Sequence, residues 1–273
     1  METERFRVEH QAAADKGFER PALAVENIVK RFGGIAAVDG VSLGIRKGEI
    51  AGLIGPNGAG KTTMFDVLAG NQHPTSGRVL LDGQPVQDKP AHCRIGLGVG
   101  RTFQIPRPFP DMTLVENVML GQQHQAGERI LPNWLQPGKV ARQESETFDK
   151  AMSHLDFLLL SKLAHQPARI LSGGQRKLLE LARVLMAEPG IILLDEPAAG
   201  VNPSLLEIIM DRIGEINRRG TTFLIIEHNM YMVSRLCRHV FVMASGKLLC
   251  EGTPADVMRD ARVVEAYLGG ATA

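Results

Sequence analysis

The chain has 273 residues, 44% of them hydrophobic, and its 31 basic and 30 acidic residues leave a formal net charge of +1. This composition argues against a disordered chain, and the balanced charge gives no overall positive field, so no nucleic acid partner is expected. The sequence has three scattered cysteines without a C-x-x-C pair, no apolar leader in its first residues and no run near the ~18 apolar residues of a membrane span, so it predicts neither a disulfide framework, a secretory signal nor a membrane-spanning segment.

The N-terminal third alternates short β-branched runs with turn glycines. Residues 1–21 are polar and are predicted to form a flexible tail. The apolar run at 49–55 ends in glycine, and the segment after it has the spacing of a helix that stops at Gly70. Strands are predicted over 22–29, 41–45, 49–55 and 77–83, and a helix over 61–70.

The middle of the chain predicts helices around an irregular segment. The apolar spacing of "MTLVENVMLG" (112–121) suits a helix, and helical periodicity returns over 139–160. Between them, residues 121–138 hold two prolines, three glycines and the only tryptophan, which is typical of an insertion without regular structure.

The last hundred residues alternate helices with apolar strands. The sequence predicts a helix after Ser172 that Pro189 and Gly190 end, and a hairpin over 239–252 that turns at Ser245 and Gly246. Strands are predicted over 191–197 and 221–228, and helices over 203–220, 254–258 and 261–267. Apolar strands that alternate with helices indicate an α/β fold with a mostly parallel sheet covered on both faces.

The stretch "GPNGAGKT", from Gly55 to Thr62, fits the pattern G-x-x-x-x-G-K-[ST] without a mismatch and lies between a predicted strand and a predicted helix. Glycines let several backbone N–H groups point into one concave space, and the helix N-terminus adds positive potential, so the loop suits phosphate. Lys61 can reach the terminal phosphates, and the Thr62 hydroxyl can ligate Mg²⁺. The alternative is a plain glycine turn after a strand.

Two acids end the buried run at 191–194. Alone, Asp195 and Glu196 would suit a strand that emerges into solvent. With a phosphate loop in the same chain, Asp195 becomes an expected indirect ligand of Mg²⁺, and Glu196 is placed to polarise the water that attacks ATP. Hydrolysis needs mostly positioning and charge stabilisation, which these groups could supply.

The stretch "LSGGQ", from Leu171 to Gln175, narrows the class. With it, the chain resembles the ATP-binding subunits of ABC transporters over about residues 22–268, because the phosphate loop, Gln104, "LSGGQ", Asp195-Glu196 and His228 occur in the family's order. The resemblance implies a P-loop NTPase core with a mostly parallel sheet, an N-terminal antiparallel β subdomain and a helical signature subdomain. One ABC ATPase domain would span 22–268, with the helical subdomain at about 105–188 and the insertion 121–138 within it.

The resemblance also implies site residues. ATP would be bound by Phe32, Gly55, Asn57, Gly58, Ala59, Gly60, Lys61, Thr62 and Thr63. Catalysis would use Glu196, His228, Lys61 and Gln104, and Mg²⁺ would be held by Thr62, Gln104 and, indirectly, Asp195. A second subunit paired head to tail would offer its signature to this chain's ATP, as the signature residues of this chain would to the partner's: Ser172, Gly173, Gly174 and Gln175.

Several of these residues have ordinary alternatives. Phe32, where the family more often has tyrosine, could lie at the edge of the core rather than stack on adenine. Gln104 and His228, taken alone, would be a surface and a structural residue, and Ser172 with its glycines could be an ordinary helix N-cap. Asn202 departs from the family's usual aspartate, which puts in doubt a charged contact across the subunits there.

Longer motifs resemble a subgroup, the larger ATPase of branched-chain amino acid importers. They include "RTFQIPRPFPDMTLVENV", "DEPAAGVNP" and the ending "EAYLG". The expected function is therefore ATP hydrolysis that energises import of branched-chain or other hydrophobic amino acids. The expected partners are a second ABC ATPase, transmembrane permease subunits and, indirectly, a solute-binding protein, at the cytoplasmic face of the inner membrane. The alternatives are another solute such as urea, an amide or lipopolysaccharide, a non-transport ABC ATPase, and a nucleotide-binding module that no longer hydrolyses.

Apolar residues close in sequence to Gln104 form a candidate docking surface for the membrane subunit: Phe103, Phe109 and Met112. The alternative is that they belong to the core of the helical subdomain.

Overall fold

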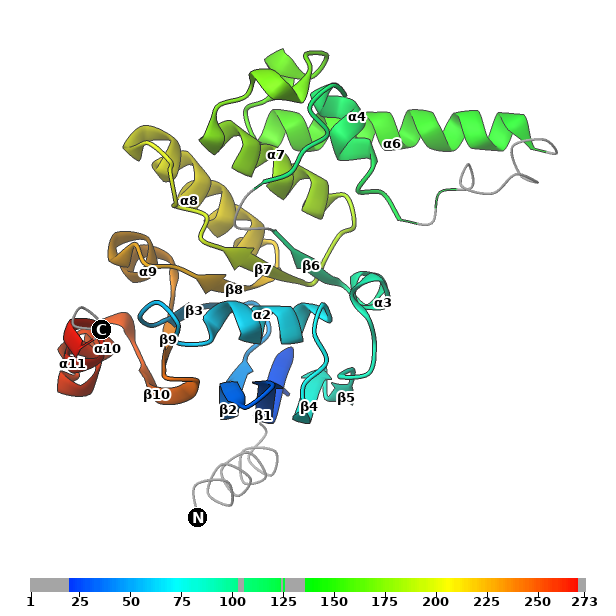
Figure 1. Ribbon diagram of the computed structural model, residues 1–273. Helices are drawn as coiled ribbons and strands as arrows, with labels where there is room; N and C mark the ends of the chain where they lie inside the picture. Colours follow the sequence, from blue (N-terminus) through cyan, green and yellow to red (C-terminus); the bar gives the residue numbers. More distant parts are fainter. Residues whose placement is uncertain (1–19, 103–105, 124, 126–135, 270–273) are drawn as a thin grey trace.

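The computed structural model describes residues 20–102, 106–123, 125 and 136–269, which build two β-sheets and a group of helices (Figure 1). The larger sheet has six strands in the order β10-β9-β3-β8-β7-β6, and only β10 runs antiparallel to its neighbour. Its strands are β3 (Ile50–Ile54), β6 (Val99–Arg101), β7 (Ile191–Asp195), β8 (Thr222–Ile226), β9 (His239–Ala244) and β10 (Lys247–Gly252). The mostly parallel sheet is as predicted, and so is the hairpin of β9 and β10, which turns at Ser245 and Gly246.

The second sheet is the predicted antiparallel one, in the order β2-β1-β4-β5. It comprises β1 (Leu23–Phe32), β2 (Ile35–Ile45), β4 (Ser76–Leu81) and β5 (Gln84–Pro85). The predictions of strands over 22–29 and 41–45 were too short. The sequence "VDGV" looks like a turn, but Gly40, with φ 74°, and Asn27, with φ 53°, are accommodated inside continuous strands whose pairing register shifts. Irregular strands of this kind carry turn residues without ending.

Successive residues of the parallel strands point to opposite faces of the sheet and so belong to two different hydrophobic cores. In β7, Ile191 and Leu193 face one core, and Ile192 and Leu194 face the other. The first core lies between the two sheets and encloses α2 (Lys61–Ala69), as Figure 1 shows. Because both faces are covered, these strands are apolar throughout, which is why they were recognisable in the sequence.

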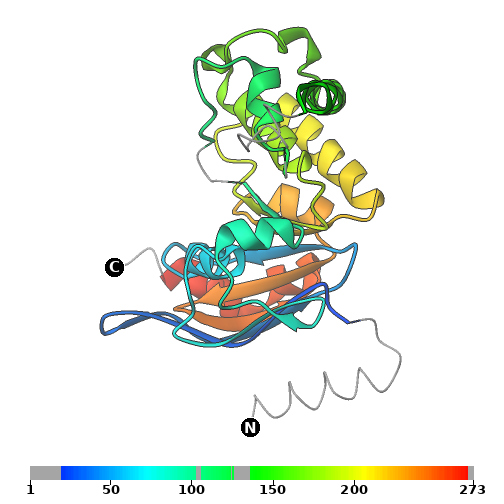
Figure 2. The ribbon, with the colours of Figure 1, turned by 90° about the vertical axis from the view of Figure 1, so that its right-hand side faces the viewer.

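The other face of the six-stranded sheet carries the remaining large helices (Figure 2). Helices α4 (Leu114–Met119), α6 (Pro137–Phe157) and α7 (Gly173–Leu185) pack on one another, and their buried side chains share one core with the sheet. The remaining helices are α3 (Ala91–Gly96), η2 (Ser161–Leu163), η3 (Ala168–Ile170), α8 (Pro203–Arg218), α9 (Met230–Leu236), α10 (Pro254–Arg259) and α11 (Ala261–Gly269). Helices α3 and α9 and the short strands β5 and β6 were not predicted.

The predicted insertion 121–138 overlaps the start of α6, because that helix begins at Pro137 rather than at 139. Proline is well suited to a first helical position, so the prediction ended the irregular segment two residues too late. Residues 124 and 126–135 of the insertion lie outside the described residues. Within the described ranges, no helix combines the length and the apolar character needed to cross a membrane.

Arg94, on α3, binds the C-terminal end of α2. Its guanidinium is 1% exposed and donates to the carbonyl oxygens of Val67 and Leu68, both at 2.6 Å, and of Lys89 and Val86 at 2.9 and 2.8 Å. Burial lowers the pKa of Arg94 to about 10, so the group stays charged at neutral pH. The last carbonyl groups of a helix lack partners within it, and a cation at this end also interacts favourably with the negative end of the helix dipole.

We expect Arg94→Met to lower the free energy of unfolding by at least about 2 kcal/mol, because four backbone carbonyl oxygens lose a charged hydrogen-bond donor. Chemical denaturation of the purified chain measures the change. Arg78→Met is the matched control, since Arg78 is exposed and its guanidinium pairs with the Glu26 carboxylate at the surface, at 2.5 Å. It should change stability by less than about 1 kcal/mol. Equal losses in the two variants would contradict the role given to Arg94.

Candidate functional site

The glycine-rich loop joins the carboxyl end of β3 to the N-terminus of α2. Gly60, the residue before the helix, has φ 94°, and a Cβ on it would lie 2.2 Å from the carbonyl oxygen of Ala37. Only glycine fits this conformation next to the backbone of β2. Asn57 and Gly58 are exposed at the crest of the loop, and no side chain of the described chain caps α2. The first N–H groups of α2 are therefore available to an anion.

Lys61 folds back over this loop. Its Nζ donates to the carbonyl oxygens of Gly55 and Pro56, at 2.7 and 2.9 Å. Burial lowers the pKa of Lys61, and the negative charges of Glu196 and Asp195 oppose that shift. The lysine therefore lies between the phosphate loop and the two acids that end β7. Thr62 is exposed one residue further on, and Thr63 is half-buried.

Asp195, the last residue of β7, belongs to a buried ion cluster. Its carboxylate is 4% exposed and lies 3.4 Å from Arg101, which also contacts Asp66 of α2 at 2.6 Å. Burial raises the pKa of Asp195, while the charge of Arg101 acts in the opposite direction. Arg101 thus ties the end of β7 to the helix that follows the phosphate loop. Asp195 is not a strand end that simply emerges into solvent.

Glu196 is held in an unusual backbone conformation beside His228. Its φ is 48°, in the left-handed region that non-glycine residues seldom adopt, and its N–H donates to Ile226 at 3.0 Å. The carboxylate oxygen Oε1 lies 3.2 Å from Nε2 of His228, which follows β8. Strain of this kind concentrates at functional sites. The structure therefore brings Lys61, Asp195, Glu196 and His228 to one edge of the six-stranded sheet.

Glu227, between β8 and His228, joins the two loops that carry this pair. The residue is 2% exposed, and its Oε1 accepts from the N–H of Ala198 at 2.6 Å. Its Oε2 accepts from the N–H groups of His228 and Asn229, at 2.9 and 3.0 Å. One buried carboxylate thus fixes both the loop after Glu196 and the loop of His228.

The signature residues open α7 with a capping box. The Ser172 hydroxyl accepts from the N–H of Gln175 at 3.3 Å, and the Gln175 side chain accepts from the N–H of Ser172 at 3.0 Å. This is the N-cap arrangement that the sequence left open as an alternative. Ser172 and Gly173 remain exposed, whereas Gly174 is buried. Their contact with a partner's nucleotide stays a prediction.

Four further residues singled out in the sequence lie apart from this cluster or outside the described residues. Phe32, at the end of β1, is 49% exposed, and Nζ of Lys30 lies 5.0 Å from its ring centre, so it is not buried in the core. Asn202 caps α8, with its Oδ1 accepting from Leu205 N–H at 2.9 Å, a role that aspartate fills equally well. Gln104 and Phe103 lie outside the described residues.

Three residues around the site were missed by the sequence reasoning: Arg101, Lys177 and Glu227. Lys177, on α7, donates from Nζ to the carbonyl oxygen of Glu196. The sequence position of Glu227 could have indicated its role. It directly follows an apolar strand and precedes a candidate histidine, and an acid at the end of a central strand is expected to be buried and hydrogen-bonded. Arg101 and Lys177 carried none, since long cations on a strand end and on a helix are usually solvated.

A phosphate loop between a parallel strand and a helix, with acids at the end of another strand of the same sheet, defines a P-loop nucleoside triphosphatase. Comparison with known proteins narrows the class. Residues 38–199 match the ABC transporter family, and residues 247–273 match the branched-chain amino acid ATP-binding cassette transporter family. The chain belongs to the ABC transporter family, among the ATP-binding proteins of branched-chain amino acid transport, and it is an ATPase cassette.

One relative is a probable branched-chain amino acid transport ATP-binding protein LivG from Archaeoglobus fulgidus, 40% identical over 90% of this chain and 95% of its own. A solved ATP-binding cassette of an ABC transporter in its ADP conformation is 39% identical, covers 91% of this chain and 99% of its own, and has a TM-score of 0.78. A dimeric cassette in a post-hydrolysis state, bound to ADP and Pi, is 25% identical over 85% of this chain and 98% of its own, with a TM-score of 0.71.

We expect Glu227→Gln to lower the free energy of unfolding by about 1–3 kcal/mol, because an amide nitrogen would replace one oxygen and face a backbone N–H donor. Thermal or chemical denaturation checks this. Glu251→Gln is the control, as Glu251 is exposed and its carboxylate meets His239 only at 3.4 Å. That variant should stay within about 0.5 kcal/mol of the parent chain. A loss no larger than the control's would mean that Glu227 does not hold the two loops.

Proposed function

We propose that this chain binds and hydrolyses ATP to energise the import of branched-chain amino acids. The observation that carries the proposal is the meeting of Lys61, Glu196 and His228 at one sheet edge, in a chain so similar to transport ATP-binding proteins. The solute itself is supported by kinship alone, since this subunit would not contact it.

ATP would enter at the glycine-rich loop. Lys61 would exchange the carbonyl oxygens of Gly55 and Pro56 for the terminal phosphates, and the N–H groups at the start of α2 would bind the phosphate oxygens. The residues that contact the nucleotide would be Phe32, stacked on adenine, and Gly55, Asn57, Gly58, Ala59, Gly60, Lys61, Thr62 and Thr63.

Mg²⁺ fits the donors that this site offers. Among the described residues, no three or more histidine, cysteine or acidic side chains gather into a group suited to a metal. Mg²⁺ is usually held by one or two protein oxygens together with phosphates and waters. The exposed Thr62 hydroxyl would hold it directly and Asp195 indirectly, with Gln104 as a further ligand. Bound there, it would neutralise charge on the phosphates.

Hydrolysis would depend on the Glu196–His228 pair. The Glu196 carboxylate would orient and polarise the attacking water, because its side chain is partly open to solvent while its backbone is fixed. His228 would keep that carboxylate in place, at its 3.2 Å contact, and would reach the γ-phosphate. Lys61 would stabilise charge that develops on the phosphates.

A head-to-tail dimer would complete each ATP site. Ser172, Gly173, Gly174 and Gln175 would face the nucleotide of a second ABC ATPase, and the exposure of Ser172 and Gly173 supports this. The helical subdomain at about 105–188 of a single 22–268 domain would meet transmembrane permease subunits, which in turn receive solute from a binding protein. The cassette would then lie at the cytoplasmic face of the inner membrane.

Two variants separate binding from hydrolysis. We expect Lys61→Ala to weaken ATP binding by at least about 10-fold, because a charged hydrogen-bond donor is lost. We expect Glu196→Gln to bind ATP like the parent chain and to hydrolyse it at least ~10²-fold more slowly, since one positioned catalytic group is lost. Nucleotide titration and phosphate release measure the two quantities. Parental turnover in Glu196→Gln would move the catalytic role to another residue.

Light scattering tests the dimer in the same material. Glu196→Gln should shift from monomer to dimer at saturating Mg-ATP, because ATP binds the closed dimer better and hydrolysis no longer reopens it. The Lys61→Ala variant is the control and should stay monomeric. The absence of a shift in Glu196→Gln would count against the head-to-tail assembly.

Phe109 tests the membrane partner. It is 49% exposed on the segment before α4, so it is not a core residue, and Arg183 lies 5.7 Å over its ring. We expect Phe109→Asp to abolish leucine uptake in vesicles with the permease subunits and the binding protein, while basal ATPase activity stays unchanged. Met258→Asp, a similarly exposed site on α10, should leave uptake intact. Uptake of urea or an amide instead of leucine by the parent system would overturn the proposed solute.

A further inference from the structure

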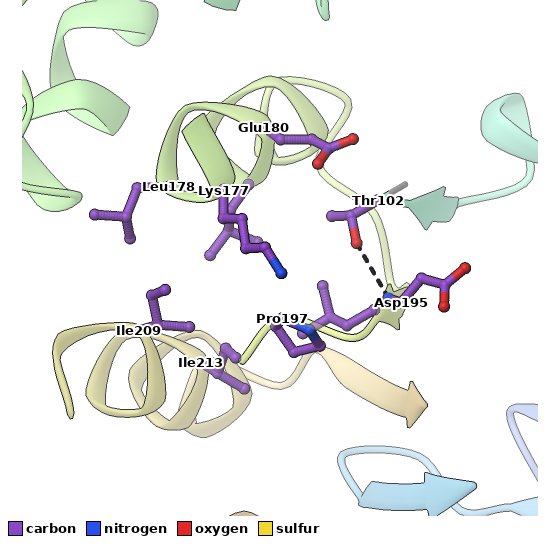
Figure 3. Close-up of a pocket in the computed structure, with 10 residues that line it drawn as sticks. Thr102, Lys177, Leu178, Glu180, Asp195, Pro197, Ile209 and Ile213 are labelled. Atoms are coloured by element: carbon purple, nitrogen blue, oxygen red, sulfur yellow. Dashed lines mark hydrogen bonds between the residues drawn. The ribbon is translucent and has the colours of Figure 1, made fainter. Parts of the chain in front are cut away.

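Helix α7 begins with the signature residues, and it also contacts the loop that follows β7 and carries Glu196. Its first turn holds the signature glycines, and Lys177 follows one turn later. From there the Lys177 ammonium reaches across to the loop after β7 and donates to the carbonyl oxygen of Glu196. In Figure 3 the side chain of Lys177 extends from the helix toward Pro197 and the end of β7.

The packing of the first turn strengthens this connection. A Cβ on Gly174 would lie 2.3 Å from Cδ2 of Leu205 and 3.3 Å from Cγ1 of Val201, so the helix rests directly on the segment after Glu196 and on the start of α8. A side chain at position 174 would therefore require Leu205 to move. The start of α7 and the loop after Glu196 are therefore in contact at two places, at Gly174 and at Lys177.

The carbonyl that Lys177 binds belongs to Glu196, whose φ of 48° is in the left-handed region, and it also accepts from the N–H of Ala199 at 3.1 Å. Burial lowers the pKa of Lys177, and the negative charges of four acids around the ammonium group oppose that shift: Glu227, Glu196, Glu180 and Asp195. Lys177, on α7, thus places a positive charge next to the acids at the ends of β7 and β8.

We propose that Lys177 is a positioning residue for hydrolysis, which fixes the strained backbone of Glu196 and couples the signature helix to the catalytic carboxylate. The inference rests on the proposed function. If the signature of this chain binds the partner's ATP, a displacement of α7 reaches Glu196 of the same chain through Lys177. The Glu196 carboxylate then approaches His228 in the orientation described above only when α7 is seated.

Two substitutions on the full-length chain test this role. Lys177→Met keeps the length of the side chain and removes the ammonium group, and we expect kcat to fall by about 10- to 100-fold while KM for Mg-ATP changes less than about 2-fold, as a misplaced catalytic group predicts. Lys177→Arg keeps a donor and a charge, and it should restore kcat to within about 3-fold of the parent chain. Lys162→Met, at an exposed lysine of η2, is the matched control and should hydrolyse ATP normally.

A second readout distinguishes positioning from folding or from signature function. In the Glu196→Gln background, Lys177→Met should leave ATP-driven dimer formation intact, because Lys177 acts on the hydrolytic carboxylate rather than on closure. Loss of dimer formation there, parental kcat in Lys177→Met, or a folded Lys177→Arg as slow as Lys177→Met would each overturn the proposal. If Lys177→Met does not fold, the kcat of Lys177→Arg and Lys177→Gln decides, and it should be near normal in the first and reduced in the second. A parent chain that neither binds nor hydrolyses ATP would instead refute the proposed function.

Discussion

The parallel register of β3, β8 and β7 is the constraint on which the site depends. Ile50 to Leu53 pair with Phe223 to Ile226, and Ile191 to Asp195 pair with Thr222 to Ile226, so all three strands end at the same edge. Because the strands are apolar, the polar residues lie in the loops that follow them, at this edge of the sheet. Residues far apart in sequence, Lys61, Glu196 and His228, therefore meet because the strands before them end in step.

Around this edge of the sheet, the buried charged side chains bind partners that come from other strands, helices or loops. Arg101 of β6 bridges Asp66 of α2 and Asp195 of β7, and Glu227 gathers N–H groups from two loops. Isolated buried charges would be strongly unfavourable, but each of these reaches a partner from a different segment. The same contacts that neutralise the charges also fix the relative positions of the loops.

Much of this arrangement was predictable from the sequence, for identifiable reasons. Strands β7 and β8 are buried on both faces and are therefore apolar throughout, and the loop between β3 and α2 has a residue pattern tied to its chemistry. Strands β1 and β2 were drawn too short because a bulge and a turn use the same residues. Helices α3 and α9 were missed because each spans only about two turns and so shows little periodicity. The contacts of Arg94, Arg101 and Lys177 could not be predicted, since they depend on which segments meet in space.

The pairing of Lys61 with the carbonyl oxygens of Gly55 and Pro56 bears on how the loop behaves before any ligand arrives. These two hydrogen bonds tie the first residue of α2 to the beginning of the loop and restrain the loop backbone. Under the proposed function, Lys61 would exchange the two carbonyl oxygens for phosphate oxygens, while the restrained backbone would need little further ordering. Less conformational entropy would then be lost when the nucleotide binds.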